Sequence, residues 1–171
     1  MTRTFRISEA AFEALSEDAR NQNVSLNTLV NQLLITYLDY DRFMKKAHMV
    51  KVAGPTLKLL MDAGPVEAIK AAGGETGRGI PALFILSQYG AVSLETLLAY
   101  FRNASEHGGL FEYNEVSHGS EKTLTFIHFL GMKGSYFISS AASALFEAAG
   151  IKVESKLSEN AVVLSFHATV P

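Results

Sequence analysis

The stretch from Thr2 to Ser8 constrains the fold most, because it reads as one short β-strand that helical sequence follows at once. Its side chains alternate, with Phe5 and Ile7 on one face and Thr2, Thr4 and Arg6 on the other. A single strand leaves backbone N–H and C=O groups unpaired on both edges, and the sequence from 9 to 46 offers no second strand. We therefore expect the same strand of a second copy to pair with it antiparallel about a two-fold axis, which predicts a homodimer.

Two helices are predicted after this strand. Ser8 is the expected N-cap of a helix over 9–22, and Ser25 is the expected N-cap of a second helix over 26–46. The apolar residues of the second helix recur at three- and four-residue spacing: Leu26, Leu29, Val30, Leu33, Leu34, Tyr37 and Leu38. This stripe is wider than one partner helix can cover, so it also favours a dimer.

Residues 1–41 resemble the Arc/MetJ/CopG ribbon-helix-helix superfamily of DNA-binding proteins. The segments that carry the resemblance are Phe5-Arg6-Ile7-Ser8-Glu9, Phe12-x-x-Leu15 and Val24-Ser25-Leu26-Asn27-Thr28-Leu29-Val30. The resemblance implies an intertwined dimer whose two-stranded ribbon enters the major groove, where each base pair presents its own pattern of donors and acceptors. The expected partner is therefore double-stranded DNA.

The resemblance also implies which residues contact DNA. It directs Thr2, Thr4 and Arg6 toward the bases, since arginine can pair with guanine O6 and N7 and threonine can bond bases or touch a thymine methyl group. It sets the helix start at Ser25, Leu26 and Asn27 against a phosphate, which free N–H groups and the helix dipole favour. Arg3 is expected to contact the DNA backbone. The alternative interpretation is a solvated strand face in a dimerisation module that has no DNA role.

Charge and composition exclude some classes of protein but do not identify the function. The formal net charge is −2, and acids balance bases around the N-terminal motif, so we expect only modest non-specific affinity for DNA. No apolar run approaches the roughly 18–20 residues of a membrane span, and no signal peptide is recognised. The chain has no Cys, which excludes disulfides and thiolate metal sites and fits a cytoplasmic protein.

Residues 47–171 are predicted to form a second domain of α+β class. Its expected helices cover 54–62, 65–72, 80–89, 93–107 and 134–149, and its expected strands cover 48–53, 110–116, 123–129, 151–157 and 161–166. The last four strands predict an antiparallel sheet with helices on one face. The glycine-rich segment 73–79 lacks the Lys-Ser/Thr ending of a phosphate loop, and we interpret it as a mobile connector.

The segment His128-Phe129-Leu130-Gly131-x-x-x-Ser135 resembles the C-terminal domain of certain archaeal ribbon-helix-helix regulators. There, a His-x-Leu-Gly-x-x-Trp-Ser segment joins a strand to a helix, whereas this chain has Gly134 in place of the tryptophan. His128, Gly131 and Ser135 are the candidate ligand-binding residues on this resemblance. From the residues alone, His128 is either a hydrogen-bonded core histidine or a pocket or dimer-interface group with Ser135. Ser135 is expected to cap the following helix or lie in its first turn, and not to act as a nucleophile.

The histidines are dispersed along the chain, at His48, His107, His118, His128 and His167. Because none is closely paired in sequence, we predict neither a metal site nor a cofactor, and the lack of a catalytic constellation argues against an enzyme. The sequence therefore predicts a homodimeric, cytoplasmic transcriptional regulator, such as a repressor. Residues 1–46 bind DNA in this interpretation, and residues 47–171 sense a small-molecule effector or promote further assembly. The alternatives are a structural dimerisation protein that binds no DNA, and a metal or small-molecule sensor.

Overall fold

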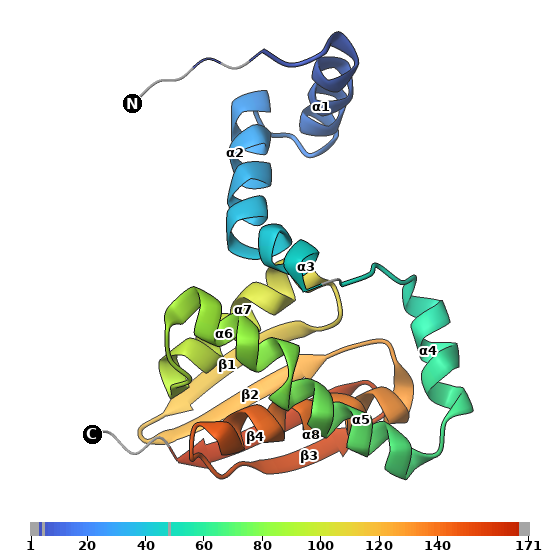
Figure 1. Cartoon of the computed structure of the whole chain (residues 1–171), viewed down its shortest axis with the longest axis vertical. Helices are drawn as coiled ribbons and strands as arrows, with labels where there is room; N and C mark the ends of the chain where they lie inside the picture. Colours follow the sequence, from blue (N-terminus) through green and yellow to red (C-terminus); the bar gives the residue numbers. More distant parts are fainter. Residues whose placement is uncertain (1–3, 5, 48, 168–171) are drawn as a thin grey trace. The chain divides into compact units, whose positions relative to one another are not determined.

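The structure is a computed structural model that describes residues 4, 6–47 and 49–167. It divides into two compact units, Met1–Lys46 and Ala47–Pro171, and each is described here by itself (Figure 1). No single helix in the described ranges is long and apolar enough to cross a membrane, although Val66–Tyr89 and Leu94–Gly108, bent by 109°, pass the same test as a pair.

Unit 1, Met1–Lys46, is helical from Glu9 onward. Helix α1 covers Glu9–Asn21 and α2 covers Leu26–Thr36, and α2 continues through a π-helical turn, η1 (Tyr37–Asp41), into α3 (Arg42–Lys46). The two predicted caps are confirmed. The Ser8 hydroxyl accepts a hydrogen bond from the Ala11 N–H at 3.3 Å, and the Ser25 hydroxyl accepts one from the Thr28 N–H at 3.0 Å.

The predicted N-terminal ribbon is wrong. Of the described residues before α1, Thr4 and residues 6–8 are not in a strand, and every strand in the described ranges belongs to one sheet in the second unit. Alternating side chains do not by themselves make a strand, because backbone groups need a pairing edge, and residues 9–46 form helices that supply none. Thr2, Arg3 and Phe5 lie outside the described residues. The ribbon-helix-helix fold is therefore not the fold of unit 1.

The predicted strand over 48–53 is also wrong. Residues 49–53 have no regular secondary structure, and α4 begins at Gly54. The segment has a strand-like composition, but among the described residues β1–β4 pair only with one another, and no edge of the sheet pairs with residues 49–53. An apolar, β-branched sequence without a pairing partner stays irregular.

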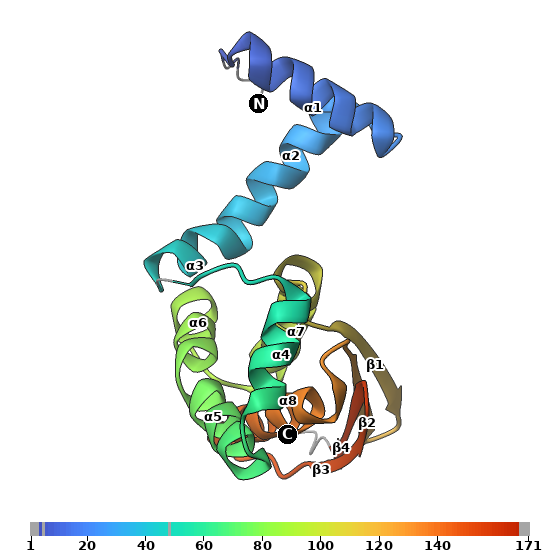
Figure 2. The same ribbon diagram turned by 90° about the vertical axis from the view of Figure 1, so that its right-hand side faces the viewer.

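Unit 2, Ala47–Pro171, confirms the α+β class. Four helices come first: α4 (Gly54–Ala63), α5 (Val66–Arg78), α6 (Ile80–Tyr89) and α7 (Leu94–Gly108). They are followed by β1 (Glu112–His118), β2 (Glu121–Ile127), α8 (Gly131–Ala148), β3 (Glu154–Ser158) and β4 (Ala161–His167). The sheet is antiparallel with the order β1-β2-β4-β3. Figure 2 shows the helices on one face of this sheet and the other face open.

The core of unit 2 lies between the sheet and the helices α6, α7 and α8. Phe101 of α7 occupies its centre, with ring centroids 5.0 Å from Phe126 of β2 and 5.9 Å from Phe146 of α8. The strands complete this core with every second side chain. Leu124 and Phe126 face inward from β2, and Val162 and Leu164 face inward from β4. Each such side chain contributes roughly 1.5–3 kcal/mol when fully buried.

The glycine-rich segment is not a connector, because residues 73–78 lie inside α5. A Cβ added to Gly73 would lie 2.5 Å from the carbonyl oxygen of Phe137, and one added to Gly77 would collide with the carbonyl of Ala141. These glycines therefore let the backbones of α5 and α8 approach closely. Glycine weakens an isolated helix by about 1 kcal/mol relative to alanine, and the close packing of the two helices offsets that weakness.

Candidate functional site

The candidate DNA-contacting residues all belong to unit 1. Thr4 and Arg6 are exposed and precede α1, while Ser25 and Asn27 are exposed at the start of α2 and Leu26 is half-buried. Thr2 and Arg3 lie outside the described residues. The structure thus leaves Thr4, Arg6, Ser25 and Asn27 accessible to a partner, but it does not hold Thr4 and Arg6 on a strand.

The start of α2 has the features of an anion-binding helix end. Ser25 caps it through its hydroxyl, which lies 2.7 Å from the hydroxyl of Thr28, and its carbonyl accepts the N–H of Leu29 at 3.0 Å. The first turn contains no acidic residue. The N–H groups of Leu26 and Asn27 come before the first intrahelical donor, so they and the helix dipole can attract an anion such as a phosphate.

Unit 1 exposes a broad apolar surface. Among its described residues only Ala19 and Leu29 are buried. The second half of the predicted stripe is about half exposed: Leu33 48%, Leu34 50%, Tyr37 46% and Leu38 49%. We call these four residues the α2–η1 face. Figure 2 shows α1 lying across the start of α2, while the rest of α2 and η1 extend away from it. One copy of unit 1 therefore leaves this face in water.

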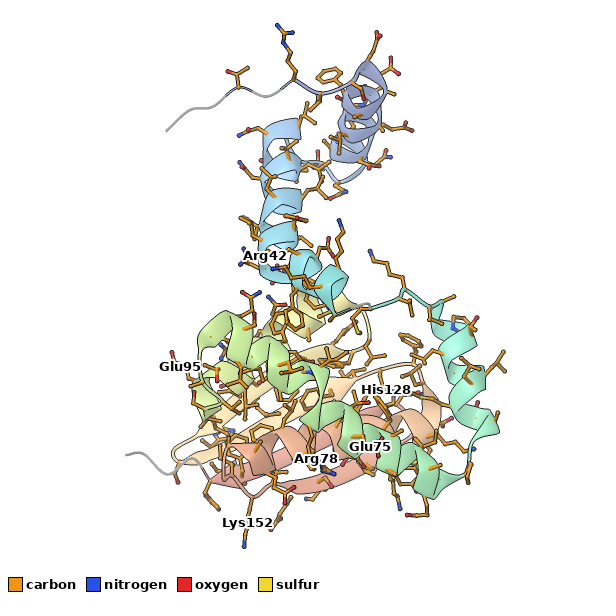
Figure 3. All side chains as sticks on the ribbon, in the orientation of Figure 1. Arg42, Glu75, Arg78, Glu95, His128 and Lys152 are labelled. Atoms are coloured by element: carbon orange, nitrogen blue, oxygen red, sulfur yellow. The ribbon has the colours of Figure 1, made fainter. Side chains whose placement is uncertain are left out.

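In unit 2, the candidate residues His128 and Ser135 lie at the corner where β2 leads into α8. Figure 3 labels His128 there. The structure brings these two side chains together, because His128 Nε2 is 2.9 Å from Ser135 Oγ. Both residues are buried, His128 at 6% and Ser135 at 0% exposure. Helix α8 begins at Gly131, earlier than the expected residue 134, so Ser135 lies beyond the first turn and is not a cap.

The hydrogen bonds around His128 fix its tautomer. The Leu130 N–H donates to His128 Nδ1 at 3.2 Å, so Nδ1 carries the lone pair and Nε2 carries the proton. Nε2–H then donates to Ser135 Oγ, whose own proton goes to the carbonyl of Ser158 at 2.5 Å. Burial lowers the pKa of His128, which favours this neutral form.

This chain of bonds is a structural joint and leaves no free nucleophile. Ser135 already donates its proton to a carbonyl, and the imidazole nitrogen that faces it is a donor and cannot act as a base. The structure agrees with the core-histidine interpretation of His128. Gly131 belongs to the same corner, since its N–H donates to the side-chain oxygen of Asn160 at 3.0 Å.

The roles of two residues of this corner, Asn160 and Gly134, were not anticipated from sequence. Asn160, in the turn between β3 and β4, bonds Gly131 through its side chain and accepts the His128 N–H through its carbonyl at 2.9 Å. A turn asparagine commonly bonds its own neighbours, so its position alone gave no sign of this long-range role. Gly134 is required by packing, because an added Cβ would collide with Leu130 and lie 3.2 Å from the His128 ring. A tryptophan at 134 would not fit here.

The structure also has a hollow of about 580 Å³ at the other end of the sheet, which none of the predicted site residues lines. Its lining comes from the start of β2, the end of β4 and the segment that leads into β3: Glu121, Gly150, Ile151, Lys152, Val153, Glu154, Ser165, Phe166 and His167. Figure 3 shows Lys152 here, at the end of the sheet away from His128.

No protein-family model and no curated protein matches this chain. Together with the helical start of unit 1, this result overturns the resemblance to ribbon-helix-helix proteins, including the resemblance of residues 128–135 to the C-terminal domain of archaeal regulators. The short motifs that carried both resemblances are degenerate enough to arise on other folds. The function has to be argued from the site geometry itself.

Proposed function

We propose that the chain is a homodimeric DNA-binding regulator in which unit 1 supplies both the dimer contact and the DNA contacts. The observation that carries the proposal is that the exposed α2–η1 face and the anion-ready start of α2 belong to one small helical unit. Arg6 adds an exposed guanidinium to the same unit.

The dimer part rests on burial. A unit whose described residues bury only Ala19 and Leu29 has too small a core to be stable alone. Large apolar side chains left about half exposed along one helix mark an interaction surface. A second copy offers the same surface, and a two-fold axis lets equal faces cover each other. A second copy of the chain is therefore the simplest occupant of the α2–η1 face, because it requires no other protein.

The DNA part rests on the chemistry of the helix start and of Arg6. In a two-fold dimer each of these groups occurs twice, so a symmetric DNA site with two half-sites would match them. Main-chain N–H groups at the α2 start would contact a phosphate. Arg6 would pair with guanine, and Asn27, exposed beside the helix start, could bond adenine. In this proposal unit 2 senses a small-molecule effector or promotes further assembly, and the protein is cytoplasmic.

The DNA affinities of the wild type and of two arginine variants test the proposal. Binding of the full chain to a labelled duplex is measured at several salt concentrations for the wild type, Arg6→Ala and the control Arg78→Ala, whose exposed arginine lies in unit 2. We expect Arg6→Ala to weaken binding by about 1–3 kcal/mol on a preferred site if it reads a base, and Arg78→Ala to leave it unchanged. Equal binding by all three proteins would defeat the role of Arg6.

A second candidate is a structural dimerisation protein that binds no DNA. It is favoured by the charge of residues 1–46, which contain as many acidic as basic side chains. DNA affinity grows with the number of phosphates neutralised, so a charge-balanced unit begins with little attraction. A stable dimer that binds neither random nor selected duplexes at low salt would support this candidate over the first.

A further inference from the structure

We propose that one corner of the open face of the sheet binds a divalent transition-metal cation such as Zn²⁺, through His118, Glu121 and His167. The site belongs to unit 2, and it does not depend on DNA binding by unit 1. The three residues lie far apart in sequence, and the strand register brings them together. The histidines are dispersed in sequence, which argued against a metal site, but the pairing of the strands brings two of them close to Glu121.

The register places the three residues side by side in one row across three strands. His118 of β1 is paired with Glu121 of β2, and Glu121 is paired with His167 of β4. Residues that are directly opposite each other in an antiparallel pair have Cβ atoms about 4.5–5.5 Å apart on the same face. The two histidines therefore flank the carboxylate at a spacing that one ion above the sheet can bridge.

All three side chains belong to the face away from the helices. Along β2, Leu124 and Phe126 are buried against the core, so Glu121 lies on the opposite face by alternation. Along β4, Phe166 is buried, so its neighbour His167 also lies on the open face. The three residues are exposed, which means that a cation reaches them without any rearrangement of the core.

A fourth ligand is available from the neighbouring strand. Glu154 of β3 is paired with Ser165 of β4, one row away from His167 on the same face. Diagonal neighbours of this kind are about 7–8 Å apart, within reach of a long side chain. Glu121, Glu154 and His167 also line the hollow described above. Lys152 lines it as well, and its charge opposes a cation, but two carboxylates outweigh one ammonium.

The backbone under the site is held in register by a tight turn. Only Gly119 and Ser120 separate His118 from Glu121, and Gly119 has φ of 61°, a left-handed conformation suited to glycine at the first position of a two-residue hairpin turn. A two-residue loop fixes the pairing on either side of it. The spacing of His118 and Glu121 is therefore set before any metal binds.

The chemistry matches a borderline divalent cation. Imidazole nitrogen and carboxylate oxygen are both ligands of Zn²⁺, which takes four donors in a tetrahedral arrangement. As the side chains lie, no three His, Cys, Asp or Glu residues in the described ranges are grouped to hold an ion. The proposal therefore requires the three exposed side chains to turn toward one another about their own bonds when the ion binds, a motion that takes picoseconds to nanoseconds for exposed residues.

Calorimetric titration of the metal-free full chain with Zn²⁺ tests the proposal. We expect one equivalent to bind per chain, and binding to weaken by at least about tenfold in the double variant His118→Gln/His167→Gln. The matched control is His107→Gln, because His107 is on α7 in the helix layer, and it should bind Zn²⁺ as the wild type does. No saturable binding by the wild type, or equal binding by the double variant, would overturn the site.

Histidine NMR supplies the second measurement and does not depend on how the variants fold. On addition of Zn²⁺ to the wild type, the imidazole resonances of His118 and His167 should shift or broaden before those of the other histidines. The buried His128 serves as the internal reference, since both of its ring nitrogens are already engaged. A response confined to other histidines would overturn the assignment.

Discussion

His128 and Ser135 are joined by a hydrogen bond of 2.9 Å inside unit 2, and the Ser135 hydroxyl donates a hydrogen bond to the carbonyl of Ser158. This bond ties the end of β2, the first part of α8 and the turn between β3 and β4 into one joint. In it Nδ1 accepts a hydrogen bond from the Leu130 N–H, Nε2–H donates to the Ser135 hydroxyl, and that hydroxyl donates to the Ser158 carbonyl. We therefore expect unit 2 to lose stability when this joint is substituted and when the pH falls.

Replacing Ser135 with alanine should destabilise the protein. The His128 Nε2–H and the Ser158 carbonyl would lose their shared partner inside the fold, and a buried polar group left unsatisfied costs about 1–3 kcal/mol. Urea unfolding of the full chain measures this loss, and Ser155→Ala, at an exposed position of β3, is the control. A change below about 0.5 kcal/mol, the usual range for surface substitutions, would show that the joint contributes little.

Stability should fall in acid because of His128. Burial lowers its pKa in the folded protein, so the unfolded chain takes up a proton first and gains stability relative to the fold. The contribution of the neutral histidine is full above its ordinary pKa of about 6.5, and it is lost as the pH falls through that value toward the lower folded pKa. The free energy of unfolding should therefore fall more steeply between pH 7.5 and 5 in the wild type than in His128→Gln. Parallel pH profiles would contradict this prediction.

The two glycines Gly77 and Gly74 of α5 should respond differently to alanine. A Cβ at Gly77 would collide with the Ala141 carbonyl of α8, whereas one at Gly74 would meet only the flexible end of Arg78, at 3.4 Å. Gly77→Ala should cost about 1–3 kcal/mol through overpacking. Gly74→Ala should be neutral or stabilise the helix by up to about 1 kcal/mol. Thermal unfolding of both variants measures the difference, and equal effects would contradict the close packing of α5 on α8.

A charge on the α2–η1 face should break the proposed dimer. Leu33→Asp would bury a carboxylate in the interface, and loss of the leucine contact alone removes roughly 1.5–3 kcal/mol, which is about tenfold or more in the dissociation constant. Gln32→Asp is the matched control, since the exposed position 32 lies about 100° round the helix from position 33 and about 120° from position 38, on the side away from this face. Sedimentation velocity should show dissociation of Leu33→Asp only. Dissociation of both variants, or of neither, would contradict the assignment of this face.

The helices were predictable where caps and periodicity act locally. Ser8 and Ser25 each mark a helix start in the sequence, and each caps one in the structure. What failed depended on neighbours that are distant in sequence. Gly73 and Gly77 signal a loop by composition, and only the adjacent backbone of α8 explains why they are helical. The strand expected near the N-terminus failed because strand formation needs a partner that alternation does not reveal.

Among the candidate site residues, too, those close in sequence could be predicted and those brought together by the fold could not. His128 and Ser135 were found because a strand end and a helix start are close in sequence, whereas Asn160 joined them through the fold alone. His118 and Glu121 fall between the expected strands over 110–116 and 123–129, so the sequence pattern alone pairs neither of them. The Gly119-Ser120 pair between them is a recognised two-residue hairpin signal, and it would have set their register. His167 could not be added without knowledge of the strand order β2-β4.

The central claim is that a homodimer of this chain recognises DNA through unit 1, and selection from random duplexes tests it most directly. Full-length wild type and Arg6→Ala are each used to enrich bound DNA, which is then sequenced. We predict that the wild type enriches a two-fold symmetric site and that Arg6→Ala loses preference at symmetric guanine positions. Recovery of unselected sequence by the wild type, although the protein sediments as a dimer, would contradict the claim and leave unit 1 as a dimerisation module.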